Sequence, residues 1–139
     1  MAQTSDADVR SAVAVFERYN QALVDKDYSQ LRTHLLHAPF VIVDDTPRVI
    51  ATVDAVVAGL QKTRESLDAA GYATTRVSVP RTSVLSRDRL LLNCRLLHLN
   101  REGAVIAERA NFYLMVRVAG TWKVGGIISE DPERFEAPR

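Results

Sequence analysis

The chain has little of the residues and patterns that mark several specialised protein classes. Its 139 residues include one cysteine, Cys94, so an intramolecular disulfide is excluded and no metal-binding spacing of cysteines exists. Because Cys94 stands in an apolar stretch, we expect a small core residue rather than a nucleophile. No apolar run approaches the ~20 residues that span a bilayer, and the start of the chain lacks the basic and apolar regions of a signal peptide. A cytoplasmic protein with no membrane partner is therefore expected.

The sequence also has almost no excess of positive over negative charge. Lys and Arg together number 18 and Asp and Glu 17, which gives a formal net charge of +1, and the basic residues are spread along the chain. Nucleic-acid binding needs a basic surface, so no nucleic-acid partner is expected. The sequence also lacks a glycine-rich phosphate loop, a Ser-His-Asp arrangement and a third ligand near His34 and His37. We therefore predict neither a cofactor nor a metal.

What the chain does contain is a helical pattern in its first half. Apolar residues recur at helical spacing, and the breaks between them predict three helices, at about residues 6–24, 28–36 and 52–70. Residues 40–43 are predicted to form a short strand that runs into Asp44-Asp45-Thr46-Pro47. Tyr19 lies on the apolar face of the first helix with Phe16, so its buried hydroxyl should need a partner.

The second half is a series of strands. Residues 72–86 are predicted to form an irregular strand, in which Pro80 indicates an edge position or a bulge because proline has no N–H to donate. Three more strands are predicted and are joined by the turns Arg101-Glu102-Gly103 and Ala119-Gly120, where glycine allows positive φ. They cover residues 89–100, 104–118 and 121–129. Helices grouped before strands predict an α+β fold, and without repeats or a linker we expect a single domain over 1–139 with loose tails at 1–5 and 131–139.

The strand at 104–118 has two different faces. One alternating set is almost entirely apolar and includes Phe112, Leu114 and Val116, whereas the other mixes apolar residues with Arg109, Asn111 and Tyr113. A sheet covered by helices on one side only should be polar on the other. Since the apolar set also needs cover, we expect a homodimer through the outer face of the sheet, with the mixed face forming a pocket wall.

The element order and apolar pattern resemble the nuclear transport factor 2-like superfamily. The stretches that carry the resemblance are FERYNQALVDKDYSQLRTHL, FVIVDDTP, the third helix and a final meander ending in TWKVGGIIS. The chain is most similar to the SnoaL-like and ketosteroid-isomerase-like branches. The resemblance implies a cone in which a strongly curved antiparallel sheet wraps around three N-terminal helices and leaves a deep pocket. It does not by itself assign a function, because members include isomerases, cyclases, hydratases, epoxide hydrolases and binding modules.

The resemblance also implies candidate catalytic residues. In ketosteroid isomerases a tyrosine of the first helix and an acid of a strand donate hydrogen bonds to a developing enolate, and an aspartate moves the proton. Tyr19 matches the tyrosine, since it stands eight residues before Asp27 as the family pattern requires. The base falls at Asp44 or Asp45, and the strand acid is replaced by Asn111, which can still donate. The Arg-x-Asp pair of the superfamily's epoxide hydrolases is likewise broken at Asn111.

Each candidate also has a structural interpretation. Tyr19 is either a pocket donor or a core residue bonded to a carbonyl, and Asp44 and Asp45 are either a base or acids that bind turn amides. Ligand-binding candidates are Arg109, His98, Tyr113 and Phe16; Arg109 alternatively forms an ion pair, and His98 is alternatively a wall residue.

Two functions follow from these residues. The first is a pocket for a hydrophobic, carbonyl-bearing small molecule, with cofactor-independent isomerisation or cyclisation by proton transfer. Its alternative is a non-catalytic ligand-binding or dimerisation module of the same fold.

Overall fold

The computed structural model describes residues 5–130 and confirms the predicted α+β fold. The helical segments are α1 Asp6–Asp25, α2 Tyr28–Gln30 with its π-helical continuation Leu31–Leu35, and α3 Val53–Ala69. The strands are β1 Leu36–Val43, β2 Arg48–Ile50, β3 Tyr72–Ser86, β4 Arg89–Asn100, β5 Val105–Val118 and β6 Thr121–Glu130. Except for Ser5, the tails expected at 1–5 and 131–139 lie outside the described residues.

The two long helices begin at side-chain caps that the sequence supplies. The Ser5 hydroxyl accepts a hydrogen bond from the Asp8 amide at 3.1 Å, and the Asp8 carboxylate accepts one from the Ser5 amide at 3.2 Å. This capping box makes Ser5 the N-cap of α1. At α3, the Thr52 hydroxyl accepts from the Ala55 amide at 3.2 Å.

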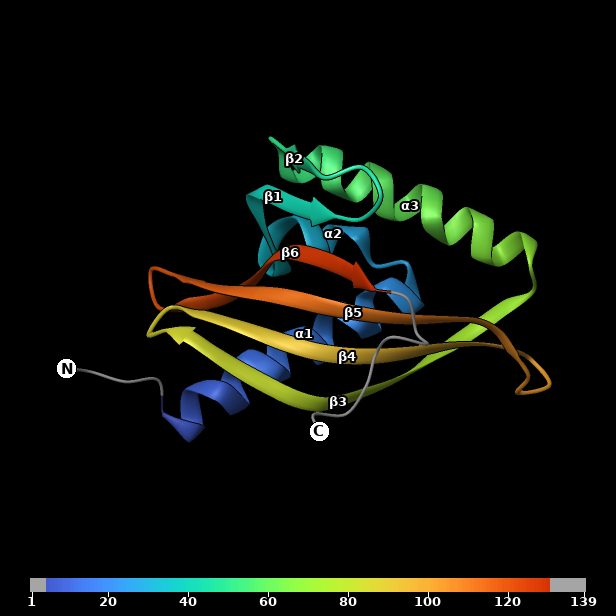
Figure 1. Ribbon diagram of the computed structural model, residues 1–139. Coiled ribbons are helices and arrows are strands. Elements are labelled where there is room, and N and C mark those ends of the chain that lie inside the picture. Colours follow the sequence, from blue (N-terminus) through green and yellow to red (C-terminus); the bar gives the residue numbers. More distant parts are fainter. Residues whose placement is uncertain (1–4, 131–139) are drawn as a thin grey trace.

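The strands form one curved sheet in the order β2-β1-β6-β5-β4-β3. Strands β3 to β6 make the predicted antiparallel meander, and β1 joins it parallel to β6. Pro80 lies in the edge strand β3, where the register shifts between Ser78 and Arg81, as the sequence indicated. Figure 1 shows α1 behind the meander and α3 above it, alongside β1 and β2. Since α1 contacts β3, β4 and β6 and α3 contacts β1, β2 and β3, the helices occupy one side of the sheet.

Two connections differ from the sequence-based expectation. Strand β1 begins at Leu36, where the helical segment ends, rather than at residue 40. Strand β2, which we did not predict, pairs with β1 in a hairpin that brings Arg48 opposite Ile42. Three residues are too few to show an alternating pattern, which explains the omission.

Close packing at β6 depends on Gly126. The register shifts between Leu114 and Met115 of β5, which pair with Gly126 and Val124, so Gly125 is the extra residue of a bulge. A Cβ atom added to Gly126 would lie 2.9 Å from the Val41 carbonyl oxygen. Glycine therefore lets β1 approach β6 closely enough to continue the sheet.

The core lies between α1, α3 and the concave face of the sheet. Its largest fully buried side chains come from both helical layers and the sheet, and they include Phe16, Phe40, Leu31, Leu35, Leu90, Leu92, Met115 and, from α3, Val57. Within residues 5–130, no helix is both long enough and apolar enough to cross a membrane.

Candidate functional site

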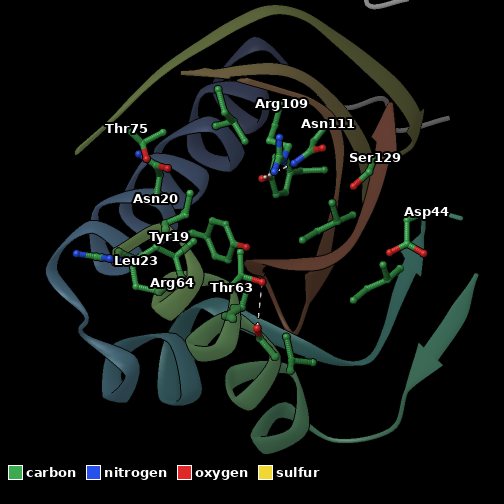
Figure 2. Close-up of a pocket in the computed structure, with 18 of the residues that line it drawn as sticks. Tyr19, Asn20, Leu23, Asp44, Thr63, Arg64, Thr75, Arg109, Asn111 and Ser129 are labelled. Atoms are coloured by element: carbon green, nitrogen blue, oxygen red, sulfur yellow. Dashed lines mark hydrogen bonds between the residues drawn. The ribbon is translucent and has the colours of Figure 1, made fainter. Parts of the chain in front are cut away.

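A cavity of about 540 Å³ opens between α1, α3 and the concave face of the sheet (Figure 2). Much of its wall is apolar and comes from all three sides, as with Leu23, Leu60 and Ile127. Most of the candidate residues predicted from the sequence line it: Tyr19, Asp44, His98, Arg109, Asn111 and Tyr113. Asp45 and Phe16 are not among the lining residues. The cavity is therefore an apolar chamber with polar groups at defined places.

Strand β5 supplies a row of three polar side chains to this wall. Arg109, Asn111 and Tyr113 alternate with outward-facing residues, so all three face the helices. Burial increases along the row, since Arg109 is exposed whereas Asn111 and Tyr113 are buried. The row therefore runs from the rim of the cavity into its interior.

The buried end of the row contains an amide that is only half satisfied. Asn111 is 7% exposed, and its Nδ2 donates to the Tyr113 hydroxyl at 3.1 Å. Its Oδ1 has no hydrogen-bond partner among residues 5–130. Turning the amide by 180° exchanges the two atoms, so either orientation leaves one polar atom of Asn111 available.

Tyr19 faces this group from α1. It is 2% exposed, and Figure 2 shows its hydroxyl directed into the cavity. Its ring lies edge-on to Tyr113 at 5.8 Å, while Phe16 packs behind both tyrosines, at 5.9 Å from Tyr19 and 4.6 Å from Tyr113. Burial, followed by the neighbouring Tyr113, raises the pKa of Tyr19 well above its usual value. The Tyr19 hydroxyl is therefore a neutral donor at physiological pH, and within residues 5–130 it makes no hydrogen bond of its own.

Asp44 is already engaged within the protein. Its Oδ1 accepts from the Thr46 amide at 2.8 Å, and Arg48 Nη1 contacts its two carboxylate oxygens at 3.0 and 3.1 Å. The Thr46 amide, followed by Arg48, holds the pKa of Asp44 below its usual value. Asp44 is thus a weak base in this state, and Asp45 is exposed.

Asp44 also stands apart from Asn111 across the sheet. Asn111 pairs with Ser129 of β6, and the residue before Ser129 pairs with Val43 of β1, next to Asp44. Two strand spacings, roughly 10 Å, therefore separate the backbones of Asp44 and Asn111. Figure 2 shows Ser129 between them.

A second polar group, which sequence reasoning missed in part, lies at the rim. The His98 Nδ1 is 2.8 Å from the Thr75 hydroxyl, which in turn is 2.6 Å from the Tyr72 hydroxyl. Burial, followed by the charge of Arg109, lowers the pKa of His98, so the imidazole is neutral at physiological pH. Thr75 was missed because the register that places it opposite His98 depends on the bulges of β3.

Arg64, also missed, joins α3 to the end of α1. Its Nη1 donates to the carbonyl oxygens of Leu23 and Val24, the latter at 2.9 Å, and its Nε donates to Asp68 at 2.8 Å. The guanidinium also lies over the Tyr72 ring, 4.4 Å from its centre. These contacts give the carbonyl groups at the end of α1 a charged donor and hold the two helical walls of the cavity together. No signal in the sequence pairs Arg64 with a residue 40 positions earlier.

Comparison with known proteins agrees with this architecture. The sequence profile of a family described as NTF2-like protein (DUF6841) matches residues 8–132. No curated protein sequence matches the chain.

Solved structures of similar shape share little sequence with the chain. One is a protein of unknown function with a cystatin-like fold from Nostoc punctiforme, with a TM-score of 0.73 and 12% identity, over 94% of this chain and 96% of the other. Another is Aln2 from a Streptomyces species, with a TM-score of 0.72 and 15% identity, over 95% and 96%. A third is a calcium/calmodulin-dependent protein kinase II association domain, named as putative, from Xanthomonas campestris, with a TM-score of 0.65 and 14% identity, over 96% and 94%. At these identities the likeness shows the fold alone.

Proposed function

The chain belongs to the NTF2-like family DUF6841, and within that fold we propose that it binds a small hydrophobic molecule carrying a carbonyl or a similar hydrogen-bonding group. The SnoaL-like and ketosteroid-isomerase-like branch assignment stays a prediction. Because the fold serves both enzymes and binding modules, the proposal rests on the cavity and not on the family.

The observation that carries the proposal is the unsatisfied polar group inside the apolar cavity. A buried polar atom without a partner costs roughly 1–3 kcal/mol, so such atoms are rare unless something else satisfies them. Asn111 leaves one such atom, and the Tyr19 hydroxyl faces the same chamber. A ligand carbonyl accepting from Tyr19, and from Asn111 in its turned orientation, would satisfy both residues. The apolar wall around them would cover the rest of the ligand.

A ketone with an aromatic body tests the proposal directly. We expect 2-acetonaphthone to bind the protein, as measured by calorimetric titration, and Tyr19→Phe and Asn111→Leu each to weaken binding by roughly 2- to 10-fold through loss of one hydrogen bond. Tyr28→Phe is the matched control, because Tyr28 is half-buried and lies outside the cavity lining. Leu60→Trp should fill the chamber and abolish binding while the far-UV circular dichroism and cooperative thermal unfolding are retained. Wild-type affinity in Leu60→Trp would show that the cavity is not the binding site.

A second candidate function is cofactor-independent isomerisation or cyclisation by proton transfer. One observation favours it: Asp44 lines the same cavity as Tyr19 and Asn111. For this role Asp44 must leave Arg48 when substrate binds, since its carboxylate is occupied. Such a base contributes about 10²–10⁴-fold to the rate.

The catalytic candidate has its own assay. Conversion of a β,γ-unsaturated ketone to the conjugated enone is followed by absorbance, and an aldol-type cyclisation by product analysis. If the protein is such an enzyme, Asp44→Asn should lower kcat at least about 100-fold, whereas Asp45→Asn should not, because Asp45 lies outside the cavity lining. Absence of turnover in the wild type, with 2-acetonaphthone still bound, would leave binding as the function.

A further inference from the structure

We propose that the ligand is a carboxylic acid whose carboxylate binds Arg109 at the rim of the cavity, beside His98, while its carbonyl reaches Asn111 further in. This inference rests on the proposed binding function and adds to it the charge of the ligand and its orientation. The residues at this rim are Tyr72, Thr75, His98 and Arg109, all of which line the cavity.

Arg109 is the first reason for an anionic ligand. Its Nη1 donates to the Glu108 carbonyl oxygen at 2.9 Å, and among residues 5–130 no carboxylate forms an ion pair with it. The other arginines of the lining are neutralised, since Arg48 pairs with Asp44 and Arg64 with Asp68. An unmatched guanidinium at the mouth of an apolar chamber attracts an anion and can bind a carboxylate with two parallel hydrogen bonds.

The neighbours of Arg109 are arranged to support the same anion. In the register of β4 and β5, Arg109 pairs with Leu96 and lies diagonally next to His98. The Nδ1 of His98 is engaged by Thr75, and within residues 5–130 no hydrogen bond uses its Nε2. If Tyr72 donates to Thr75 and Thr75 donates to Nδ1, the imidazole proton is on Nε2. Nε2 is then a second donor beside the guanidinium.

The spacing along β5 indicates the approximate separation of the two polar groups of the ligand. Arg109 and Asn111 are two residues apart on one strand face, so their Cα atoms lie about 6.8 Å apart, and the long Arg109 side chain can adjust the position of its guanidinium. A flat apolar body that carries a carboxylate at one end and a carbonyl at the other would span this distance. Its hydrophobic surface would face Leu23, Leu60 and Leu67 of the two helices.

Three probes that share one ring system separate the contributions. 2-Acetonaphthone carries the carbonyl alone, 6-acetyl-2-naphthoate adds the carboxylate, and the methyl ester of that acid keeps the size without the charge. We expect the wild type to bind the acid more tightly than the ester, by roughly 10- to 100-fold, which is the range for hydrogen bonds to a charged group. The preference should shrink as salt is added, because the site is at the exposed rim.

Variants then assign the preference to Arg109. Arg109→Gln should bring the ratio of acid to ester affinity close to one, and Arg109→Lys should restore part of it, since lysine keeps the charge but loses the bidentate geometry. Arg101→Gln in the exposed β4–β5 turn is the matched control and should keep the full ratio. His98→Gln should lower the ratio by a smaller factor.

Each outcome has a distinct meaning. If 2-acetonaphthone binds but the wild type does not prefer the acid to the ester, the carboxylate inference is wrong and the proposed function stands. The same holds if Arg109→Gln keeps the wild-type ratio. If no probe binds, the proposed function fails and this inference fails with it. The acid-to-ester comparison in the wild type requires no variant to fold.

Discussion

Asn111 and Asp44 show how the immediate neighbours of a side chain decide its chemistry. Both line the cavity, yet Asn111 keeps one polar atom without a partner among the described residues, whereas Asp44 is bound by Arg48 and the Thr46 amide. The first can donate to a ligand carbonyl at little cost, because turning its amide exchanges one hydrogen bond with Tyr113 for another. The second must lose an ion pair before it can accept a proton. This contrast is why binding, and not proton transfer, is the better supported function.

His98 gives a prediction about pH at the same scale. Burial, followed by Arg109, places its pKa in the folded protein below the ordinary value of about 6.5 that it has when unfolded. As the pH falls below about 6.5, the unfolded chain therefore binds more protons than the folded one, and stability must decrease. We expect His98→Gln to flatten the decrease between pH 7.5 and 5.5, measured by urea unfolding. His34→Gln, an exposed control, should behave like the wild type, and an equally steep decrease in His98→Gln would contradict the prediction.

At the scale of elements, two glycines have opposite effects on stability. Gly126 allows two strands to pack closely, whereas Gly59 only adds conformational freedom to the unfolded chain. Gly126→Ala should destabilise the protein by about 1–3 kcal/mol, because its Cβ would lie 2.9 Å from a backbone oxygen that cannot move independently. Gly59→Ala should instead stabilise it by about 0.5–1 kcal/mol, since this helical position has no atom within 4 Å of the added Cβ. Thermal or urea unfolding measures both changes. A Gly126→Ala variant as stable as wild type would show that β1 does not need the close approach.

Much of the element pattern could be predicted from the sequence, and the exceptions have physical causes. Strands β3 and β4 were predicted with their observed bounds, because strand-forming residues and the turn residues that interrupt them are local properties of the chain. The Ala119-Gly120 turn has φ values of 51° and 79°, as a two-residue hairpin requires. Strand β2 and the parallel pairing of β1 with β6 depend on contacts distant in sequence, which no local pattern encodes.

The same distinction applies to the site. Alternation alone places Arg109, Asn111 and Tyr113 on one face, and the structure brings this face to the cavity. The sequence could not predict the state of Asp44, because its partner Arg48 returns on the unpredicted strand β2. The role of Arg64 depends in the same way on the packing of α3 against the end of α1.

At the scale of the whole molecule, the outer face of the sheet is a surface that the helices leave uncovered. The helices lie on the other side, yet the outer face carries half-buried apolar residues on three adjacent strands, namely Leu91, Leu97, Leu114 and Ile128. Arg95 and Glu108 lie on the same face, 3.9 Å apart, and offer both signs of charge to a two-fold contact. We propose that a second copy of the chain covers this face, since an outer sheet face exposed to water should be polar.

Sedimentation velocity tests this homodimer. We expect the wild type to sediment at twice its 15.5 kDa mass at micromolar concentration. Leu114→Lys should raise the dimer dissociation constant by about tenfold or more, because it buries a charge on each copy near the centre of the contact. Val84→Lys, at an exposed position of the edge strand β3, is the matched control and should remain a dimer. A wild type that stays monomeric would leave the outer face without a second copy, and its apolar residues would then be an exposed patch on a monomer.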